Sequence, residues 1–158
     1  MIFKPHLVIE VGKKLITPDA RSVYDGLDIE DKYIDPLNLF EFGDYVYYDF
    51  VYRFVLPNDE LIYSFNGSKK TNYQVLFIKS EGIINDIDGG PNILPRTIKD
   101  DNTVIALIDA LQLKAYVSSE TFKNSMPRFP EKKRDLEKLA SGLKETDNPV
   151  LIFVKIRK

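Results

Sequence analysis

The residues of this chain best suited to chemistry are the two aspartates of Asp86-Ile87-Asp88-Gly89-Gly90-Pro91. Carboxylates on alternate residues of a glycine-rich loop supply the hard oxygen ligands that calcium prefers. The helix–loop–helix calcium pattern fails, because Gly90 takes the third ligand position and Thr97 takes that of the bidentate glutamate. Asp86 and Asp88 are therefore candidate metal ligands of an irregular calcium loop, and they match no standard motif.

Two further interpretations of this loop stay open. The pair could serve a metal- or carboxylate-dependent hydrolase, which depends on a carboxylate separation that a sequence does not give. Alternatively, the loop is a tight turn in which aspartate side chains bond backbone amides and glycines supply positive φ angles. The pattern favours the tight turn. We therefore expect no catalytic residue, and calcium is the one cofactor that the sequence suggests.

The other titratable candidates point away from catalysis. His6 is the only histidine, and no serine, cysteine or second histidine stands near it to complete a relay or a metal site. An acidic segment has irregular spacing that favours a solvated loop over a cation site; it contains Asp25, Asp28, Glu30, Asp31 and Asp35. The chain holds no nucleophile-elbow, Walker or dinucleotide-binding motif. It also has no cysteine, which excludes disulfides, thiolate metal sites and a cysteine nucleophile.

An aromatic strand over Tyr45–Phe54 sets the architecture. Every second residue from Val46 to Phe54 is apolar, whereas the alternate row carries Asp49 and Arg53. Because successive strand residues point to opposite faces, we expect the Val46 row to be buried and the other row to be wetter. This pattern is typical of antiparallel sheets. On the wetter row, Tyr45 and Tyr47 are a candidate binding surface for a sugar or a protein partner, with cross-strand packing as the alternative.

Composition limits the class of partner. The chain has 158 residues, 44% of them hydrophobic, and a net charge of −2 with a pI of about 5.5. Residues 1–63 carry a net charge of −6 and residues 64–158 carry +4. An acidic pI without a clustered basic face disfavours nucleic acid. The longest apolar run is too short for a transmembrane helix, and residues 1–5 do not begin a signal peptide.

The pattern predicts one domain over 1–158, with an N-terminal strand and acidic loop over 1–36, a β-meander over 37–108, and a helical segment with a final strand over 109–158. Thr17-Pro18-Asp19 could start one helical turn in the acidic loop, and Asn66-Gly67 is expected to form a hairpin turn. The expected strands are Leu7–Val11, Leu37–Phe42, Tyr45–Phe54, Leu61–Phe65, Thr71–Lys79, Thr103–Ile108 and Val150–Ile156. The expected helices are Ala110–Val117, Ser119–Lys123 and Pro130–Leu143.

Two packing predictions concern the C-terminal part. Leu136, Leu139, Ala140 and Leu143 form one apolar stripe of the last helix, which we expect to cover part of a sheet. The final strand, Val150–Ile156, is almost continuously apolar, so we expect it to pair centrally.

Several segments, taken in order, resemble the C-terminal part of a family of bacterial six-bladed β-propeller proteins of NHL-like type. They are the meander ending at Tyr73–Ile78, the run from Gly82 to Pro91, Asp101-Asn102-Thr103, Ile108-Asp109-Ala110, Phe122-Lys123-Asn124-Ser125, Pro130-Glu131-Lys132-Lys133, Leu139-Ala140 and Asp147-Asn148-Pro149-Val150-Leu151. The resemblance is clearest from about Tyr45 onward.

This resemblance implies a mainly β fold of antiparallel meanders of the β-propeller-blade type, as an incomplete propeller with a C-terminal helical segment and a closing strand. Members of the family are extracytoplasmic lipoproteins of unknown activity, which implies a place in the cell envelope, although this chain shows no signal peptide. The implied function is a non-enzymatic binding or interaction module. Unpaired blade edges invite self-association, and a protein or glycan partner is the other expectation.

Overall fold

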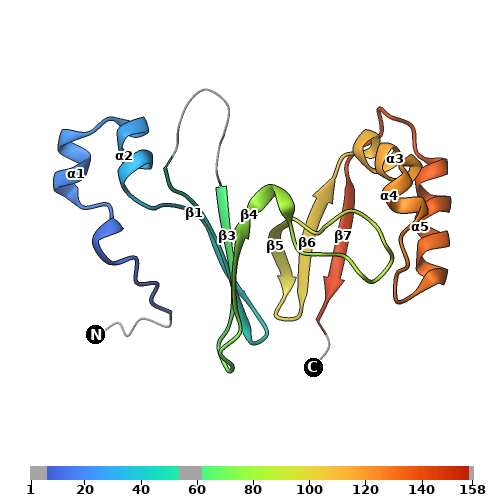
Figure 1. Ribbon diagram of the computed structural model, residues 1–158, viewed down its shortest axis with the longest axis horizontal. Coiled ribbons are helices and arrows are strands. Elements are labelled where there is room, and N and C mark those ends of the chain that lie inside the picture. Colours follow the sequence, from blue (N-terminus) through green and yellow to red (C-terminus); the bar gives the residue numbers. More distant parts are fainter. Residues whose placement is uncertain (1–6, 54–61, 157–158) are drawn as a thin grey trace.

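The computed structural model describes residues 7–53 and 62–156, and these form two antiparallel sheets with several helices (Figure 1). The first sheet has the order β1-β2-β3-β4, and the second has the order β5-β6-β7. Their strands are β1 (Asp35–Phe42), β2 (Tyr45–Val51), β3 (Ile62–Ser68), β4 (Gln74–Ile78), β5 (Pro95–Asp100), β6 (Thr103–Ile108) and β7 (Val150–Lys155). The prediction of a mainly β, antiparallel protein is confirmed.

The helices flank the sheets on either side. Their bounds are η1 (Gly12–Lys14), α1 (Pro18–Val23), α2 (Gly26–Lys32), η2 (Lys79–Glu81), α3 (Ala110–Ser118), α4 (Glu120–Lys123) and α5 (Pro130–Gly142). The α1–α2 pair lies beside the first sheet, and α3–α5 lie together beyond the second (Figure 1). The three predicted C-terminal helices and the helical turn at Thr17 are thus confirmed, with Thr17 capping α1 by accepting from the Ala20 amide.

The N-terminal part differs from the prediction in two ways. Residues 7–11 form no strand and lead instead into η1. The acidic segment is mostly helical, because Asp25 caps α2 through the amide of Asp28. A side-chain cap satisfies a backbone donor that the first helical turn otherwise leaves unpaired. The prediction for this segment was a solvated loop, with a cation site as the alternative.

The Val46 row of β2 is buried as predicted, but the alternate row, expected to be the wetter one, is buried as well. Tyr47 and Asp49 are both 0% exposed, because their row faces the second sheet. There Phe42 and Tyr47 pack with Val104 to form the buried core between the sheets. Val46 and Tyr48 are also buried, on the opposite or outer face. A central strand with cover on both faces defeats a simple inside–outside alternation.

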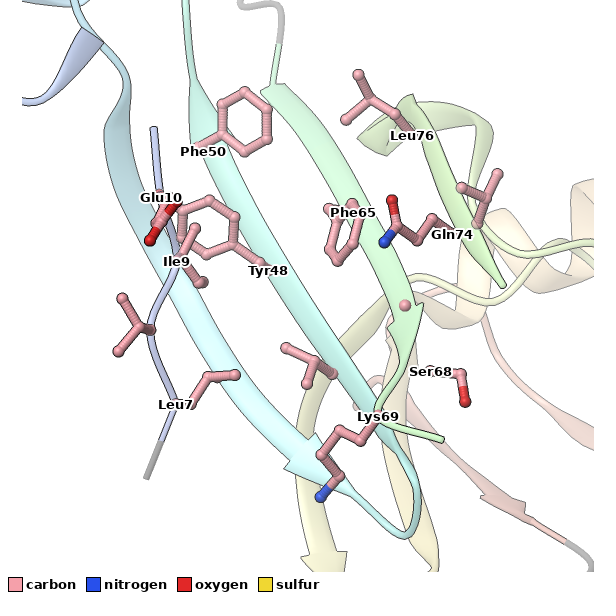
Figure 2. A pocket seen from close by; sticks show the side chains of 14 residues that line it. Leu7, Ile9, Glu10, Tyr48, Phe50, Phe65, Ser68, Lys69, Gln74 and Leu76 are labelled. Atoms are coloured by element: carbon pink, nitrogen blue, oxygen red, sulfur yellow. The ribbon is translucent and has the colours of Figure 1, made fainter. Parts of the chain in front are cut away.

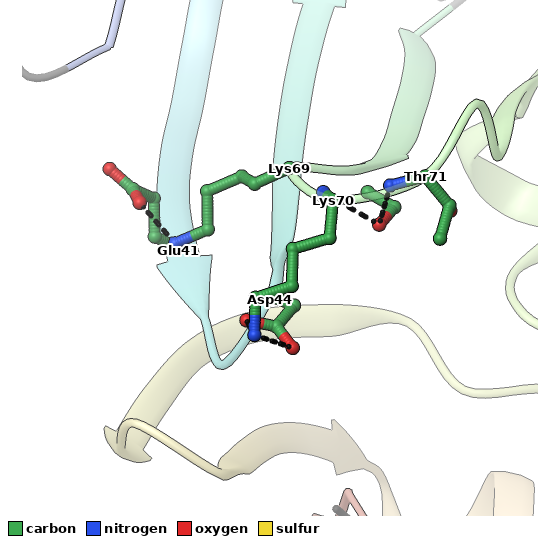
Figure 3. Close-up of polar contacts among 6 residues, drawn as sticks. Glu41, Asp44, Lys69, Lys70 and Thr71 are labelled. Atoms are coloured by element: carbon green, nitrogen blue, oxygen red, sulfur yellow. Dashed lines mark hydrogen bonds and ion pairs between the residues drawn. The ribbon is translucent and has the colours of Figure 1, made fainter.

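The predicted hairpin turn at Asn66-Gly67 is wrong, because both residues lie inside β3. Tyr47 pairs with Asn66 and Val46 pairs with Gly67. The glycine leaves room for a ring, since a Cβ atom there would lie only 2.7 Å from Phe65. The chain turns after Ser68 instead, where the Ser68 hydroxyl accepts from the amides of Lys70 and Thr71 (Figure 3).

The second sheet was only partly predicted. β6 has the expected bounds, but β5 falls in a segment that the sequence analysis left without a strand. β7 pairs only with β6, so it is an edge strand rather than a central one. Its side chains alternate between half-buried and exposed, with Leu151 and Phe153 on the exposed side.

Helix α5 packs against α3. The prediction that its apolar stripe covers part of a sheet is therefore wrong. Ala140 is its buried residue, whereas Leu139 is largely exposed. Lys114 of α3 ties the two helices together by donating to the carbonyls of Ala140 and Leu143, at 3.3 and 2.8 Å.

Candidate binding groove and buried polar cluster

An apolar groove of about 730 Å³ runs over the outer face of the first sheet (Figure 2). Its floor is formed by β2 and β3, and its walls are the segment Leu7–Glu10 on one side and β4 on the other. The lining residues of this groove are Leu7, Val8, Ile9, Glu10, Val46, Tyr48, Phe50, Phe65, Gly67, Ser68, Lys69, Gln74, Val75 and Leu76. We call this surface the outer groove.

Cross-strand register explains why the outer groove is aromatic. Tyr48 lies opposite Phe65 and Phe50 lies opposite Tyr63, so these side chains share one face. Tyr48 and Phe50 stack with ring centroids 5.3 Å apart, and Phe50 and Tyr63 stack at 5.6 Å. Leu76 lies opposite Phe65 on β4 and is 59% exposed. The face therefore presents a rigid aromatic floor with exposed aliphatic side chains beside it.

Charged residues mark the end of the outer groove near the β3–β4 turn. Lys69 donates to Glu41 at 2.6 Å, and Lys70 donates to Asp44 at 2.9 Å (Figure 3). These pairs bind the β3–β4 turn to β1 and to the β1–β2 turn. The groove is thus bounded by an ordered charged rim at this end.

A chain of polar side chains is buried on the opposite face of the same sheet. The Tyr47 and Ser64 hydroxyls are 3.0 Å apart, Ser64 Oγ donates to Asp49 Oδ1 at 2.5 Å, and Lys79 donates to Asp49 Oδ2 at 2.5 Å. Register places Asp49 directly opposite Ser64, and η2 brings Lys79 to them from the end of β4. We call these four residues the buried polar cluster.

The buried polar cluster has the residue types of a catalytic site but not the access. Ser64 is 0% exposed, so no substrate carbonyl can reach its oxygen. Burial raises the pKa of Tyr47 well above its ordinary value, and the charge of Asp49 raises it further against the opposing hydrogen bond from Ser64. The tyrosine therefore stays protonated, and the cluster has the geometry of a structural network.

The structure places the two predicted metal ligands in different surroundings. Asp86 forms an ion pair with Arg128 at 2.8 Å. Asp88 Oδ1 accepts from Asn85 Nδ2 at 2.7 Å and from the Gly90 amide at 2.9 Å, which is the geometry of an aspartate turn. Both carboxylates thus have protein partners, and calcium binding stays a prediction.

The remaining candidates are placed as follows. Tyr47 lies in the buried polar cluster and presents no surface, whereas Tyr45 is half-buried and lines a second cavity described below. His6 lies outside the described residues, as does the side chain of Glu30. Over residues 7–53 and 62–156, no group of three histidine, cysteine or acidic residues is placed to hold a metal ion.

Four residues of the outer groove and the buried polar cluster were not predicted from the sequence. The sequence around Ser64 and Lys79 does not indicate that they belong to a buried polar cluster, because their positions depend on strand register and on the position of η2. Leu76 and Phe65 belong to strands that were predicted, but their shared exposed face could be recognised only after the faces of β2 were assigned.

Comparison with known proteins gives no further constraint: no family model, no curated protein and no solved structure matches this chain. The resemblance to the six-bladed propeller family therefore stays a prediction. Within the part of the chain that the structure describes, no helix is both long and apolar enough to cross a membrane.

Proposed function

We propose that this chain is a non-enzymatic interaction module of the β-propeller-blade type, which self-associates through the outer groove. The observation that carries this proposal is the exposed apolar character of that face, with Leu76 at 59% exposure beside an ordered aromatic floor. Large apolar faces left open to solvent mark interaction sites in soluble proteins.

The architecture supports a blade-type assembly. A four-stranded antiparallel meander in sequence order is the unit from which propellers are built, and β1 to β4 have that order. One face of this meander packs against the second sheet, as neighbouring blades pack on each other. Its other face has no sheet against it among the described residues. A cell-envelope location belongs to the same proposal and depends on the family resemblance.

A second copy of this chain is the occupant that fits the outer groove best. The face is apolar enough to pack on a like face, as the two faces of stacked sheets do. Four strands of about seven residues span a face of roughly 19 by 24 Å. Two such faces total about 900 Å², which is the size of a weak, concentration-dependent interface rather than of a permanent one.

The charges at the rim of the outer groove are few and allow the same occupant. Glu10 and Lys69 are the charged residues that line the outer groove, and they lie at separate points of its rim (Figure 2). In a two-fold dimer each surface patch meets its own copy, so Glu10 of one copy can approach the Lys69–Glu41 pair of the other. An apolar face that meets its own copy about a two-fold axis forms a closed dimer rather than an open chain of copies.

The carboxylates of the glycine-rich loop support a non-enzymatic role. Asp88 is held by two hydrogen bonds within its own turn, and Asp86 is paired with Arg128. A hydrolase would need at least one of them directed at a substrate.

Single-cysteine variants test this proposal, since the chain has no cysteine of its own. Leu76→Cys places a thiol in the outer groove, and Leu111→Cys places a matched control on α3, where the leucine is 52% exposed. The thiol at position 76 should react several-fold more slowly with a soluble thiol reagent at high protein concentration than at low concentration. The thiol at position 111 should react at the same rate at both concentrations. For position 76, equal rates at every concentration would overturn the proposal.

A further inference from the structure

A second cavity, of about 360 Å³, lies between the two sheets and shares no lining residue with the outer groove. Phe42 and Tyr45 line it from the first sheet, Val104 and Val154 from the second, and Ile83 and Ile93 from the connection between them. We call it the inter-sheet cavity. Its volume lies at the lower end of the range for small-molecule sites.

Asn66 contributes a carboxamide group to the lining of this cavity. It lies on the inner face of β3, opposite Tyr47 and Val75, and it is only 9% exposed. Its Oδ1 is shielded from solvent and accepts no hydrogen bond from the described residues. Native proteins pair nearly all buried polar atoms, so an orphaned oxygen needs an explanation.

Local structure does not require an asparagine here. The position is inside a strand rather than in a turn, and an apolar or β-branched residue would pair equally well in the ladder. Burying the unpaired oxygen costs stability that a leucine would not cost. The carboxamide can turn about its broad terminal torsion and present its oxygen to the cavity. This residue is therefore suited to recognise something that occupies the cavity.

The lining defines the chemical class of the occupant. No acidic or basic side chain lines the inter-sheet cavity, which excludes recognition of a cation or an anion by charge. The other amide present, that of Asn85, is engaged with Asp88 and with the Ile87 amide. A neutral, mainly apolar molecule with one hydrogen-bond donor matches this lining.

An entrance is present on the surface. Ile84 and Tyr73 line the cavity and are themselves largely exposed, at 79% and 49%. A ligand can therefore enter between the β3–β4 turn and the segment that follows η2 without separating the sheets. We propose that the inter-sheet cavity binds a compact, neutral, apolar molecule whose single hydroxyl or N–H group donates to Oδ1 of Asn66.

Two probes of almost the same shape test this inference. 2-Naphthol carries a hydroxyl donor, and 2-methoxynaphthalene replaces it with an ether that cannot donate. By calorimetry, the unmodified protein should bind 2-naphthol about tenfold more tightly, which is the size of one net hydrogen bond. Equal affinities would overturn the inference, and so would binding of neither probe, which would assign the cavity to water.

Two variants locate the site. Asn66→Leu should lose the preference for 2-naphthol and raise the melting temperature, because it removes the unpaired oxygen. Ile84→Glu changes an exposed residue at the entrance and should weaken 2-naphthol binding several-fold without changing the melting temperature. A preference kept in Asn66→Leu, or an unchanged affinity in Ile84→Glu, would contradict the assignment. Neither variant touches the outer groove, so this test is independent of self-association.

Discussion

Asp49 and Lys79 form an ion pair of 2.5 Å in which the carboxylate is 0% exposed and the lysine side chain is 16% exposed. Ser64 donates to the other carboxylate oxygen, so the charge of Asp49 is compensated on both sides. The pair joins the middle of β2 to the turn that leaves β4. It thereby holds the first sheet to the connection that leads to the second sheet.

Removal of the lysine should leave a buried, unpaired carboxylate. We expect Lys79→Met to lower the free energy of unfolding by about 3 kcal/mol, which is the typical cost of breaking a buried pair. The control is Lys70→Met, which breaks an exposed pair with Asp44 and should cost less than about 1 kcal/mol. Urea titration measures both losses. Equal losses would show that Asp49 is less isolated from solvent than its burial indicates.

Tyr47 should make stability fall at alkaline pH. Its folded-state pKa lies above the ordinary value of 10.0, chiefly because the ring is buried. Above about pH 10 the unfolded chain loses this proton while the folded protein keeps it, so stability declines as pH rises. Below that pH the contribution is fully present.

The comparison of urea midpoints at about pH 9 and about pH 11 tests this sign. Tyr47→Phe should reduce the alkaline decline. Tyr52→Phe is the matched control. A hydrogen bond from the Lys14 side chain lowers the pKa of Tyr52, so the contribution of Tyr52 to stability rises with pH instead of falling. A decline that Tyr47→Phe leaves unchanged, or that Tyr52→Phe reduces, would contradict this assignment.

Two variants of Asp88 distinguish a structural role in the turn from a role as a metal ligand. Asp88→Asn keeps an oxygen acceptor for Asn85 and Gly90, whereas Asp88→Ala removes two hydrogen bonds. We expect the alanine variant to lose about 1–3 kcal/mol and the asparagine variant clearly less. Thermal unfolding with and without calcium completes the experiment. A calcium-dependent stabilisation that both variants abolish would favour the metal site over the turn.

Gly89 and Gly142 offer a matched pair of glycine substitutions. Gly89 has a φ of +72°, and a Cβ atom there would collide with the side chain of Ser125. Gly142 ends α5, and a Cβ atom there would meet nothing. Gly89→Ala should therefore cost about 1–3 kcal/mol, while Gly142→Ala should be neutral or slightly stabilising. Similar melting temperatures for the two variants would argue against a fixed backbone at Gly89.

Local chemistry predicted much of the fold from sequence. Period-2 alternation located β2, and an apolar stripe behind Pro130 located α5. These signals are contained within single elements, so no tertiary information was needed. The same holds for the cap at Thr17, whose side chain acts within one helical turn.

The features that differ from the prediction depend on tertiary contacts. The row of β2 that was expected to be wetter is buried, because Asp49 finds Ser64 and Lys79 as partners, which lets a charged residue occupy the core. Asn66-Gly67 stayed in a strand because the Phe65 ring fills the space above the glycine. β5 was missed because its sequence carries three charged residues, Arg96, Lys99 and Asp100, and shows little apolar alternation. Each outcome depends on a neighbour that is distant in sequence or on register.

The solution mass of the unmodified protein, measured by light scattering over a concentration series, tests the proposed function most directly. We expect a dimer for the unmodified protein and for Leu111→Glu, whose leucine lies far from the outer groove. We expect a monomer for Leu76→Glu, because a charge in the outer groove cannot be buried without a partner. A monomeric mass for the unmodified protein at the highest concentration, or a dimeric Leu76→Glu variant, would contradict self-association through this face.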